Sequence, residues 1–227
     1  MQQGNYDQAV LHCKKLVELS PDDPTVYISL SGALLKTGDY KQSIKYGLKA
    51  VEMVPDNIDA QINLAIAFNK EGDLDQAVNT YIKAFQLSPE NAKICNSLAG
   101  IFISQGKFDQ ALGYYRRSIK IDPNQVMVLH NLARIQSTRP SLLSRNIDEA
   151  IILAERLCKL TNYKQPDALD TLATVYAAAE KFPQAIETAQ KAIDVATSMN
   201  KTELAQEIAA RLELYKQSMP YMHPPLQ

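Results

Sequence analysis

Histidine and cysteine are the side chains of this sequence most able to bind a metal or a cofactor. Their spacing indicates neither a metal site nor a cofactor site. The three histidines lie far apart, at His12, His130 and His223, and none belongs to a His-Glu-x-x-His motif. The three cysteines are equally scattered, at Cys13, Cys95 and Cys158, without a Cys-x-x-Cys pair. An odd number of widely spaced cysteines is also a poor disulfide framework. We therefore predict no metal site, no cofactor and three free thiols.

Two short motifs resemble catalytic ones, but neither has the partners that catalysis needs. Lys36-Thr37-Gly38 has a Lys-Thr-Gly pattern, and the segment from Ser198 to Lys201 has a Ser-x-x-Lys pattern. The Ser-Asp-Asn motif that accompanies them in enzymes is missing from the sequence. A phosphate-binding loop and a Gly-x-Ser-x-Gly nucleophile motif are missing as well. The sequence therefore predicts no catalytic residues and a chain that is not an enzyme.

The overall charge and hydropathy narrow the class of partner. The 227 residues include 24 Lys and Arg against 25 Asp and Glu, for a formal net charge of −1. A dedicated nucleic-acid binder needs a basic surface, so we expect no nucleic-acid partner. No run approaches the roughly 18 apolar residues of a membrane span, and the first residues lack the pattern of a signal peptide. The expectation is a soluble, cytoplasmic chain without direct membrane insertion.

A repeat of 34 residues organises the elements that would position any functional side chain. Prolines recur at this spacing, at Pro21, Pro55, Pro89 and Pro123, where each can end one helix before the next begins. Glycines follow the same spacing, at Gly4, Gly38, Gly72 and Gly106, and each suits a left-handed helix end. A Leu-small pair recurs at Leu30-Ser31, Leu64-Ala65, Leu98-Ala99, Leu132-Ala133 and Leu172-Ala173. These markers predict pairs of helices that pack closely.

A helix–turn–helix unit of this length, with these markers, resembles the tetratricopeptide repeat (TPR). Tyr81 and Tyr115 match the later aromatic of that repeat, in the second helix of each pair. The resemblance implies an all-α fold, a right-handed α-solenoid of antiparallel helix pairs known as a TPR superhelix. It also implies that the first helices of successive pairs line the concave side of the array.

The register of the markers divides the chain into repeats. We predict a half repeat with only a second helix at 1–20, TPRs at 24–57, 58–91 and 92–125, a degenerate TPR at 126–165 with an inserted loop at 137–146, a TPR at 166–199, a capping helix at 200–217 and an extended tail at 218–227. The half repeat suggests an array that extends further upstream. Five extra residues between Ala133 and Ala150 define the insertion, and Glu180 replaces the turn glycine of the last repeat.

The capping helix is predicted from its start signal and its apolar stripe. Asn200 can accept a backbone hydrogen bond as the N-cap, with Glu203 in the reciprocal place of a capping box. Leu204, Ile208, Leu212 and Tyr215 form one face of this helix, and Arg211 is expected to point away from it. A solenoid needs such a helix to cover its last repeat.

The first-helix residues outside the core are the predicted peptide-binding groove. By register they are Ile62, Asn63, Ile66, Asn69, Lys93, Asn96, Ser97, His130, Asn131 and Arg134, with Asp170, Thr171 and Thr174 in the last repeat. In the TPR arrays of O-linked N-acetylglucosamine transferases, which this chain resembles, asparagines at the place of Asn63 and Asn131 grip a peptide backbone. Here Ser29, Ser97 and Thr171 interrupt such a ladder. A clamp for a C-terminal carboxylate, as in chaperone-tail receptors, is matched only by Lys93 and Asn63.

Three functions are compatible with these features. The first is a protein-protein interaction scaffold that binds an extended or helical polypeptide segment in the groove. The alternative is a regulatory or substrate-presenting arm of a larger enzyme such as a glycosyltransferase. The third is self-association through the first helix, whose apolar residues Tyr6, Val10, Leu11, Cys13, Leu16 and Val17 lack a partner helix. The identity of the partner is not encoded in these motifs.

Overall fold

The computed structural model describes residues 3–140 and 142–222, and these residues form helices joined by short connections. The first six helices are α1 (Gln3–Leu19), α2 (Pro24–Thr37), α3 (Tyr40–Met53), α4 (Ile58–Glu71), α5 (Leu74–Leu87) and α6 (Ala92–Ser104). They are followed by α7 (Phe108–Ile121), α8 (Val126–Thr138), α9 (Ile147–Leu160), α10 (Pro166–Ala178), α11 (Phe182–Ser198) and α12 (Thr202–Lys216). The predicted all-α class is confirmed.

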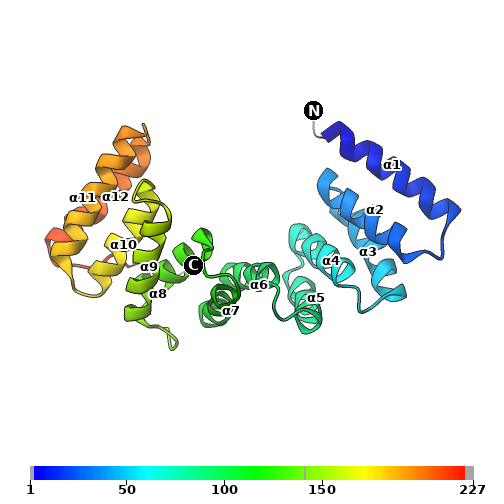
Figure 1. The fold of residues 1–227 in the computed structure, drawn as a ribbon, viewed down its shortest axis with the longest axis horizontal. Helices are drawn as coiled ribbons and strands as arrows, with labels where there is room; N and C mark the ends of the chain where they lie inside the picture. Colours follow the sequence, from blue (N-terminus) through cyan, green and yellow to red (C-terminus); the bar gives the residue numbers. More distant parts are fainter. Residues whose placement is uncertain (1–2, 141, 223–227) are drawn as a thin grey trace. The chain divides into compact units, whose positions relative to one another are not determined.

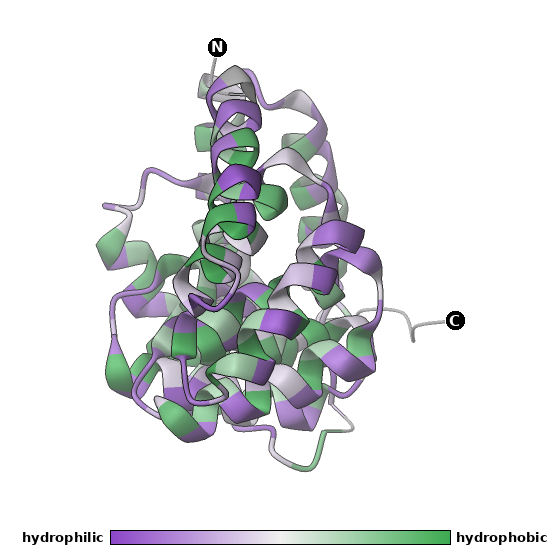
Figure 2. Cartoon of the chain, turned by 90° about the vertical axis from the view of Figure 1, so that its right-hand side faces the viewer, coloured by the Kyte–Doolittle hydropathy of each residue, from purple (hydrophilic) through white to green (hydrophobic). Residues whose placement is uncertain are grey.

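The helices pack as successive antiparallel hairpins, the architecture of a helical-repeat solenoid (Figure 1). The chain divides into two compact units, residues 1–101 and 102–227. In the first unit α1 packs on α2, α2 on α3 and α4 on α5, and α2 also contacts α4. In the second unit the contacting neighbours include α8 with α9, α10 with α11 and α11 with α12. Figure 2 shows apolar and polar residues mixed along the helices, as expected when each helix buries one face.

Three of the four glycines at the repeat spacing adopt the predicted backbone conformation, whereas Gly4 lies inside α1 and does not end a helix. The φ angles of Gly38, Gly72 and Gly106 are 84°, 94° and 72°, in the left-handed region that glycine enters without steric cost. In the first two turns the residue after the glycine is the N-cap of the second helix of the pair. Asp39 accepts a hydrogen bond from the backbone N–H of Gln42, and Asp73 does so from Gln76. Glu180 holds the same conformation, with φ 60°, where the last repeat lacks a glycine.

The core consists of the Leu-small pairs and the small residues that face them. All five pairs are buried, and so are the small second-helix residues Ser43, Ala77, Ala111, Ala150 and Ala185. The serines of the first complete repeat satisfy one another, since Ser31 Oγ donates to the carbonyl oxygen of Ser43 (3.1 Å) and Ser43 Oγ donates to that of Ser31 (2.9 Å). Close helix packing therefore occurs at the places that the register predicted.

The connection between α8 and α9 is the predicted insertion, with a corrected start. Ser137 and Thr138 belong to α8, and the connection occupies 139–146. Arg116 of α7 fixes it, because its Nη2 donates to the carbonyl oxygen of Ser144 (2.8 Å) and to Glu149 Oε2 (2.6 Å). Gln136 Oε1 accepts a bond from the backbone N–H of Asn146 (2.7 Å). The insertion is thus held by side chains of three helices.

The predicted start of the capping helix is wrong by one residue. Asn200 has φ 57°, so it ends α11 in the left-handed region instead of capping α12. The N-cap of α12 is Lys201, which makes no side-chain capping bond, and the helix begins at Thr202. Asparagine tolerates the left-handed conformation better than most residues, which explains the difference. The apolar stripe itself is confirmed by the burial of Ile208, Leu212 and Tyr215. The division into repeats stays a prediction, and the tail beyond Met222 lies outside the described residues.

Candidate functional site

The predicted groove residues lie on first helices of both units. In the first unit, we call the side formed by α2, α4 and α6 the first-helix face. In the second unit, the first-helix face is the side formed by α8, α10 and α12. In the first unit Ile62, Asn63, Ile66 and Asn69 of α4 are half-buried, as are Asn96 and Ser97 of α6, and Lys93 is exposed. In the second unit His130 and Asn131 of α8 are half-buried and Arg134 is exposed. Each set is described within its own unit.

The residue before the Leu-small pair forms a hydrogen bond within the fold in four of the five repeats, at Asn63, Ser97, Asn131 and Thr171. Asn131 Nδ2 donates to the hydroxyl of Tyr115 (3.0 Å), and Ser97 bonds to the hydroxyl of Tyr81. Burial raises the pKa of Tyr81 and of Tyr115, and these bonds offset part of that effect. The two tyrosines occupy the same place in successive repeats, so the bond is a repeated link between neighbouring helix pairs. The amide oxygen of Asn131 can still accept a bond from a ligand.

Asn63 departs from this pattern because its tyrosine is missing. The place of Tyr81 and Tyr115 is held by Gly47 in the preceding repeat, where an added Cβ would lie only 3.2 Å from Ser31 Oγ. Asn63 Nδ2 instead donates to the carbonyl oxygen of Ile28 on α2, a longer bond of 3.4 Å. Gly32 leaves room for this amide, since a Cβ there would come within 3.3 Å of Asn63 Nδ2. The asparagine therefore joins α4 to α2.

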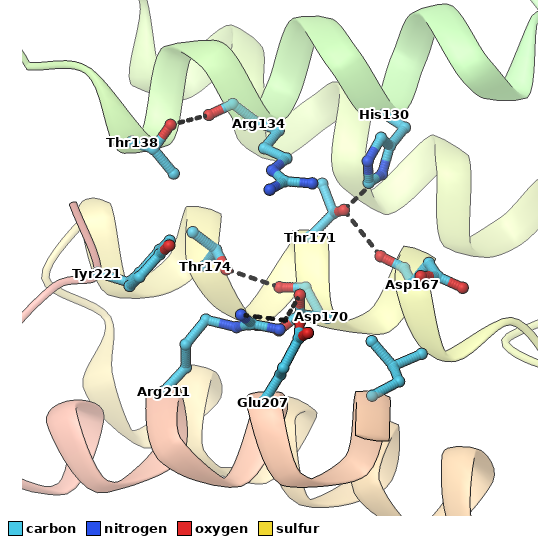
Figure 3. Close-up of a pocket in the computed structure, with 11 residues that line it drawn as sticks. His130, Arg134, Thr138, Asp167, Asp170, Thr171, Thr174, Glu207, Arg211 and Tyr221 are labelled. Atoms are coloured by element: carbon cyan, nitrogen blue, oxygen red, sulfur yellow. Dashed lines mark hydrogen bonds and ion pairs between the residues drawn. The ribbon is translucent and has the colours of Figure 1, made fainter. Parts of the chain in front are cut away.

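A polar pocket lies on the first-helix face of the second unit, between α8, α10, α12 and the tail (Figure 3). Its volume is about 110 Å³, and its lining includes His130, Arg134, Asp170, Thr171, Thr174 and Tyr221. Five of these six residues lie on helices, which hold their side chains at defined positions. Asp170, Thr171 and Thr174 are the residues that the register placed on this face.

His130 and Thr171 form one wall of the pocket. The hydroxyl of Thr171 donates to the carbonyl oxygen of Asp167 (2.8 Å), so it accepts the bond that joins it to His130 Nδ1 (2.8 Å). This assigns the ring proton to Nδ1 and leaves Nε2 as an acceptor. Burial lowers the pKa of His130, and the positive charge of Arg134 lowers it further, against an opposing effect of Asp167. The imidazole is therefore a neutral wall at physiological pH.

Asp170 and Arg211 form the floor, which the sequence did not reveal. Arg211 Nε and Nη2 each donate to a different oxygen of Asp170, both at 2.9 Å, and the two side chains are 15% and 19% exposed. Burial raises the pKa of Asp170, and the charge of Arg211 opposes that shift. Thr174 Oγ1 donates to the Asp170 carbonyl oxygen (2.9 Å) and lies 3.1 Å from the hydroxyl of Tyr215. The expectation that Arg211 points away is wrong, because Asp170 draws it toward α10.

The two sides of the pocket rim carry charges of opposite sign. The guanidinium of Arg134 makes no hydrogen bond or ion pair within the described part of the chain. On the other side Glu207 is exposed and lies 3.9 Å from Arg211, and exposed Asp167 lies 3.5 Å from Lys201. Free donors on the α8 side thus face acceptors on the α10 and α12 side. Such a pair of walls suits a ligand that both donates and accepts, as a peptide unit does.

A metal site and a membrane span each require a particular set of residues. Within residues 3–140 and 142–222 no group of three His, Cys, Asp or Glu side chains is placed to hold a metal ion. The cysteines described are free thiols, and burial raises the pKa of Cys158 to about 12. No helix in this part of the chain is long and apolar enough to cross a membrane.

Comparison with known proteins bears on the fold. A family model described as tetratricopeptide repeat matches residues 1–46 and 68–135, which together make up half of the chain. No curated protein has a sequence that matches significantly. Solved structures give many matches, and the three described next have low sequence identity.

Three of the matching structures cover most of both chains. YrrB, described as a TPR protein with an unusual peptide-binding site, has a TM-score of 0.73 at 18% identity, over 87% of this chain and 97% of its own. BtubC from P. vanneervenii has a TM-score of 0.65 at 22% identity, over 88% and 91%. MamA has a TM-score of 0.64 at 20% identity, over 72% and 92%. At these identities the likeness extends to the fold.

Proposed function

Because the chain belongs to the tetratricopeptide repeat family, we propose that it is a protein-interaction scaffold whose first-helix face binds an extended or helical polypeptide segment. The observation that carries the proposal is the pocket of the second unit, where an unpaired Arg134 faces two exposed carboxylates across a floor of satisfied side chains. A floor of satisfied side chains and an unpaired cation at the rim are features of a preformed ligand site.

The chemistry of this face favours a polypeptide over a small apolar ligand. Arg134 supplies donors, while His130 Nε2 and the amide oxygen of Asn131 supply acceptors. A backbone needs both, whatever its side chains are. In the first unit the half-buried Ile62 and Ile66 flank Asn63, so apolar side chains of a segment would find contacts there. We propose that Lys93 adds a second exposed cation to the recognition surface.

The test separates the face from the rest of the surface. Peptides would be selected from a random displayed library on the intact chain and then measured by fluorescence anisotropy against a double variant, Lys93→Ala with Arg134→Ala. We expect about a tenfold or greater loss of affinity for a peptide that contacts either cation, because a charge-assisted contact disappears from the face of that unit. Lys83→Ala with Lys120→Ala, two exposed lysines on second helices, is the matched control and should bind as the intact chain does. Equal losses in both double variants would refute the assignment to the first-helix face.

Self-association through α1 is a second proposed function, favoured by the exposed apolar side chains of this helix. Leu11, Leu16 and Leu19 are 65%, 47% and 78% exposed, whereas Val17 packs on the cluster around Val26 and Tyr27. Such a surface is typically covered by another chain. Sedimentation velocity should detect a dimer whose population rises with concentration, and Leu11→Glu with Leu16→Glu should abolish it. A monomer at every concentration of the intact chain would exclude this role.

A further inference from the structure

The tail after α12 turns back toward the first-helix face of the second unit. Ser218 adopts a left-handed conformation with φ 57°, and the backbone N–H of Met219 donates to the carbonyl oxygen of Leu214 (2.9 Å). This closes the helix, and Pro220 follows without helical structure. Tyr221 then lies half-buried in the wall of the pocket, beside side chains of α8, α10 and α12 (Figure 3).

Tyr221 meets a guanidinium whose orientation is fixed before the ring arrives. The two parallel bonds to Asp170 hold Arg211 in one plane, and the buried position of the pair restricts its movement. The centre of the Tyr221 ring lies 5.5 Å from the guanidinium carbon, within the range of a cation–π contact. The planar, delocalised cation of arginine is well suited to such stacking. Arg211 is therefore a preorganised platform for an aromatic ring.

We propose that the Arg211 platform is a subsite for an aromatic side chain of an extended partner peptide, and that Tyr221 occupies it in cis as a tethered competitor. The inference rests on the proposed function of the first-helix face and names one residue class that this face selects. Tyr221 reaches the subsite on a non-helical, proline-containing segment, which is the backbone form of an extended ligand. The ligand class is a short peptide with a tyrosine or phenylalanine, similar to the tail itself.

The tether explains how a weak intramolecular contact can regulate the subsite. A side chain attached by a short flexible segment has an effective concentration in the millimolar range. The tail occupies the subsite when the dissociation constant of its own contact lies below this concentration. A free peptide must then compete with the tail, so the intact chain binds the peptide poorly. Detachment of Tyr221 opens the subsite without any change in the helices. A tighter or multivalent partner displaces the tail and extends along the rest of the face.

The test uses a fluorescein-labelled peptide with the sequence of residues 217–222 as the probe, measured by anisotropy against full-length chains. Tyr221→Ala removes the competitor, and we expect it to bind the probe at least about fivefold more tightly than the intact chain. Tyr221→Phe keeps the ring and should bind the probe as weakly as the intact chain. The same probe with alanine at the tyrosine should lose binding to the Tyr221→Ala chain. Equal affinity of the intact and Tyr221→Ala chains, or equal binding of both probes, would overturn the proposal.

A second measurement reports on the platform without any peptide. The Nε–Hε resonance of Arg211 should carry a ring-current shift in the intact chain and in Tyr221→Phe, and should lose it in Tyr221→Ala. An unchanged resonance in Tyr221→Ala would show that the tail does not stack on Arg211 and would overturn the cis contact. Arg211→Lys keeps a positive charge beside Asp170 but lacks the planar guanidinium, so this variant should not bind the probe. If the variant does not fold, the comparison of the tyrosine and alanine probes on the Tyr221→Ala chain tests the subsite instead. A negative result for the Arg211 subsite would not change the result expected for the Lys93→Ala, Arg134→Ala double variant. The two proposals can therefore be refuted independently.

Discussion

Glu180 holds a backbone conformation that glycine holds in the other turns. Its φ of 60° lies in the left-handed region, which disfavours residues with a Cβ by roughly 1–2 kcal/mol. We predict that Glu180→Gly stabilises the chain by about 1 kcal/mol, since the strain is relieved but glycine adds freedom to the unfolded state. Urea unfolding followed by circular dichroism measures the difference.

The matched control for that prediction is Gly72→Ala. The φ of Gly72 is 94°, and an added Cβ there would meet nothing within 4 Å, so only the backbone conformation penalises the substitution. We expect a loss of about 1 kcal/mol. A neutral effect of both substitutions would show that these turns relax, and the account of strain at Glu180 would be wrong.

His130 makes the stability of the second unit depend on pH. Its pKa in the folded chain is lowered below the ordinary value of 6.5, first by burial and then by the charge of Arg134. The unfolded chain therefore takes up the proton first, and the stabilisation present above pH 6.5 is lost as the pH falls toward the folded pKa. We predict that thermal stability falls more between pH 7 and pH 5.5 in the intact chain than in His130→Gln. Parallel curves for the two chains would contradict a buried neutral imidazole.

At the level of single residues, the sequence predicted local features but not the contacts between distant helices. The turn glycines and Leu-small pairs were predicted because local chemistry and spacing determine them. Asp170 was placed on the correct face, but its bond to Arg211 joins residues 41 positions apart and depends on how α12 packs. The sequence signal for this bond was an acidic residue on α10 and a basic residue at the corresponding place on α12. Asn200 was assigned the wrong role because asparagine favours both helix starts and left-handed helix ends.

Among the elements, the connection at 139–146 depends most on one side chain from elsewhere. Arg116 is about one quarter exposed and bonds to Glu149, Gln136 and the carbonyl oxygen of Ser144. We predict that Arg116→Ala lowers the free energy of unfolding by roughly 2–3 kcal/mol, because several charge-assisted bonds are lost and Glu149 is left unpaired. Trypsin should then cleave after Arg145 much faster than in the intact chain, whereas Arg139 is protected by the proline that follows it.

Lys120→Ala, on the same helix but exposed, is the control for the insertion. It should change neither the free energy of unfolding nor the cleavage rate, since surface substitutions are usually within 0.5 kcal/mol. Cleavage of Arg116→Ala at the rate of the intact chain would show that the loop is ordered by its own residues. The sequence located this insertion by counting residues between Ala133 and Ala150, yet its bonding needed the positions of α7, α8 and α9.

At the scale of the molecule, a repeat array is stabilised mainly by contacts between neighbouring helices, so its two ends need not be equally stable. None of the side chains described in α1, residues 5–19, is fully buried, and several of its leucines are exposed. The helix α12 buries Ile208, Leu212 and Tyr215 and adds the Arg211–Asp170 pair. The repeat spacing predicted the first helix and the apolar stripe predicted α12, whereas this difference in anchoring follows from the packing.

We therefore predict that the array opens from α1 and not from α12. Hydrogen exchange followed by mass spectrometry should give amides of α1 protection factors roughly tenfold or more below those of α12, because local opening is easiest where few apolar side chains are buried. Tyr215→Ala removes a fully buried ring, at a cost of about 3–5 kcal/mol. It should bring the exchange of α12 up to that of α1 and leave α1 unchanged. Faster exchange of α12 than of α1 in the intact chain would mean that this anchoring does not decide which end opens.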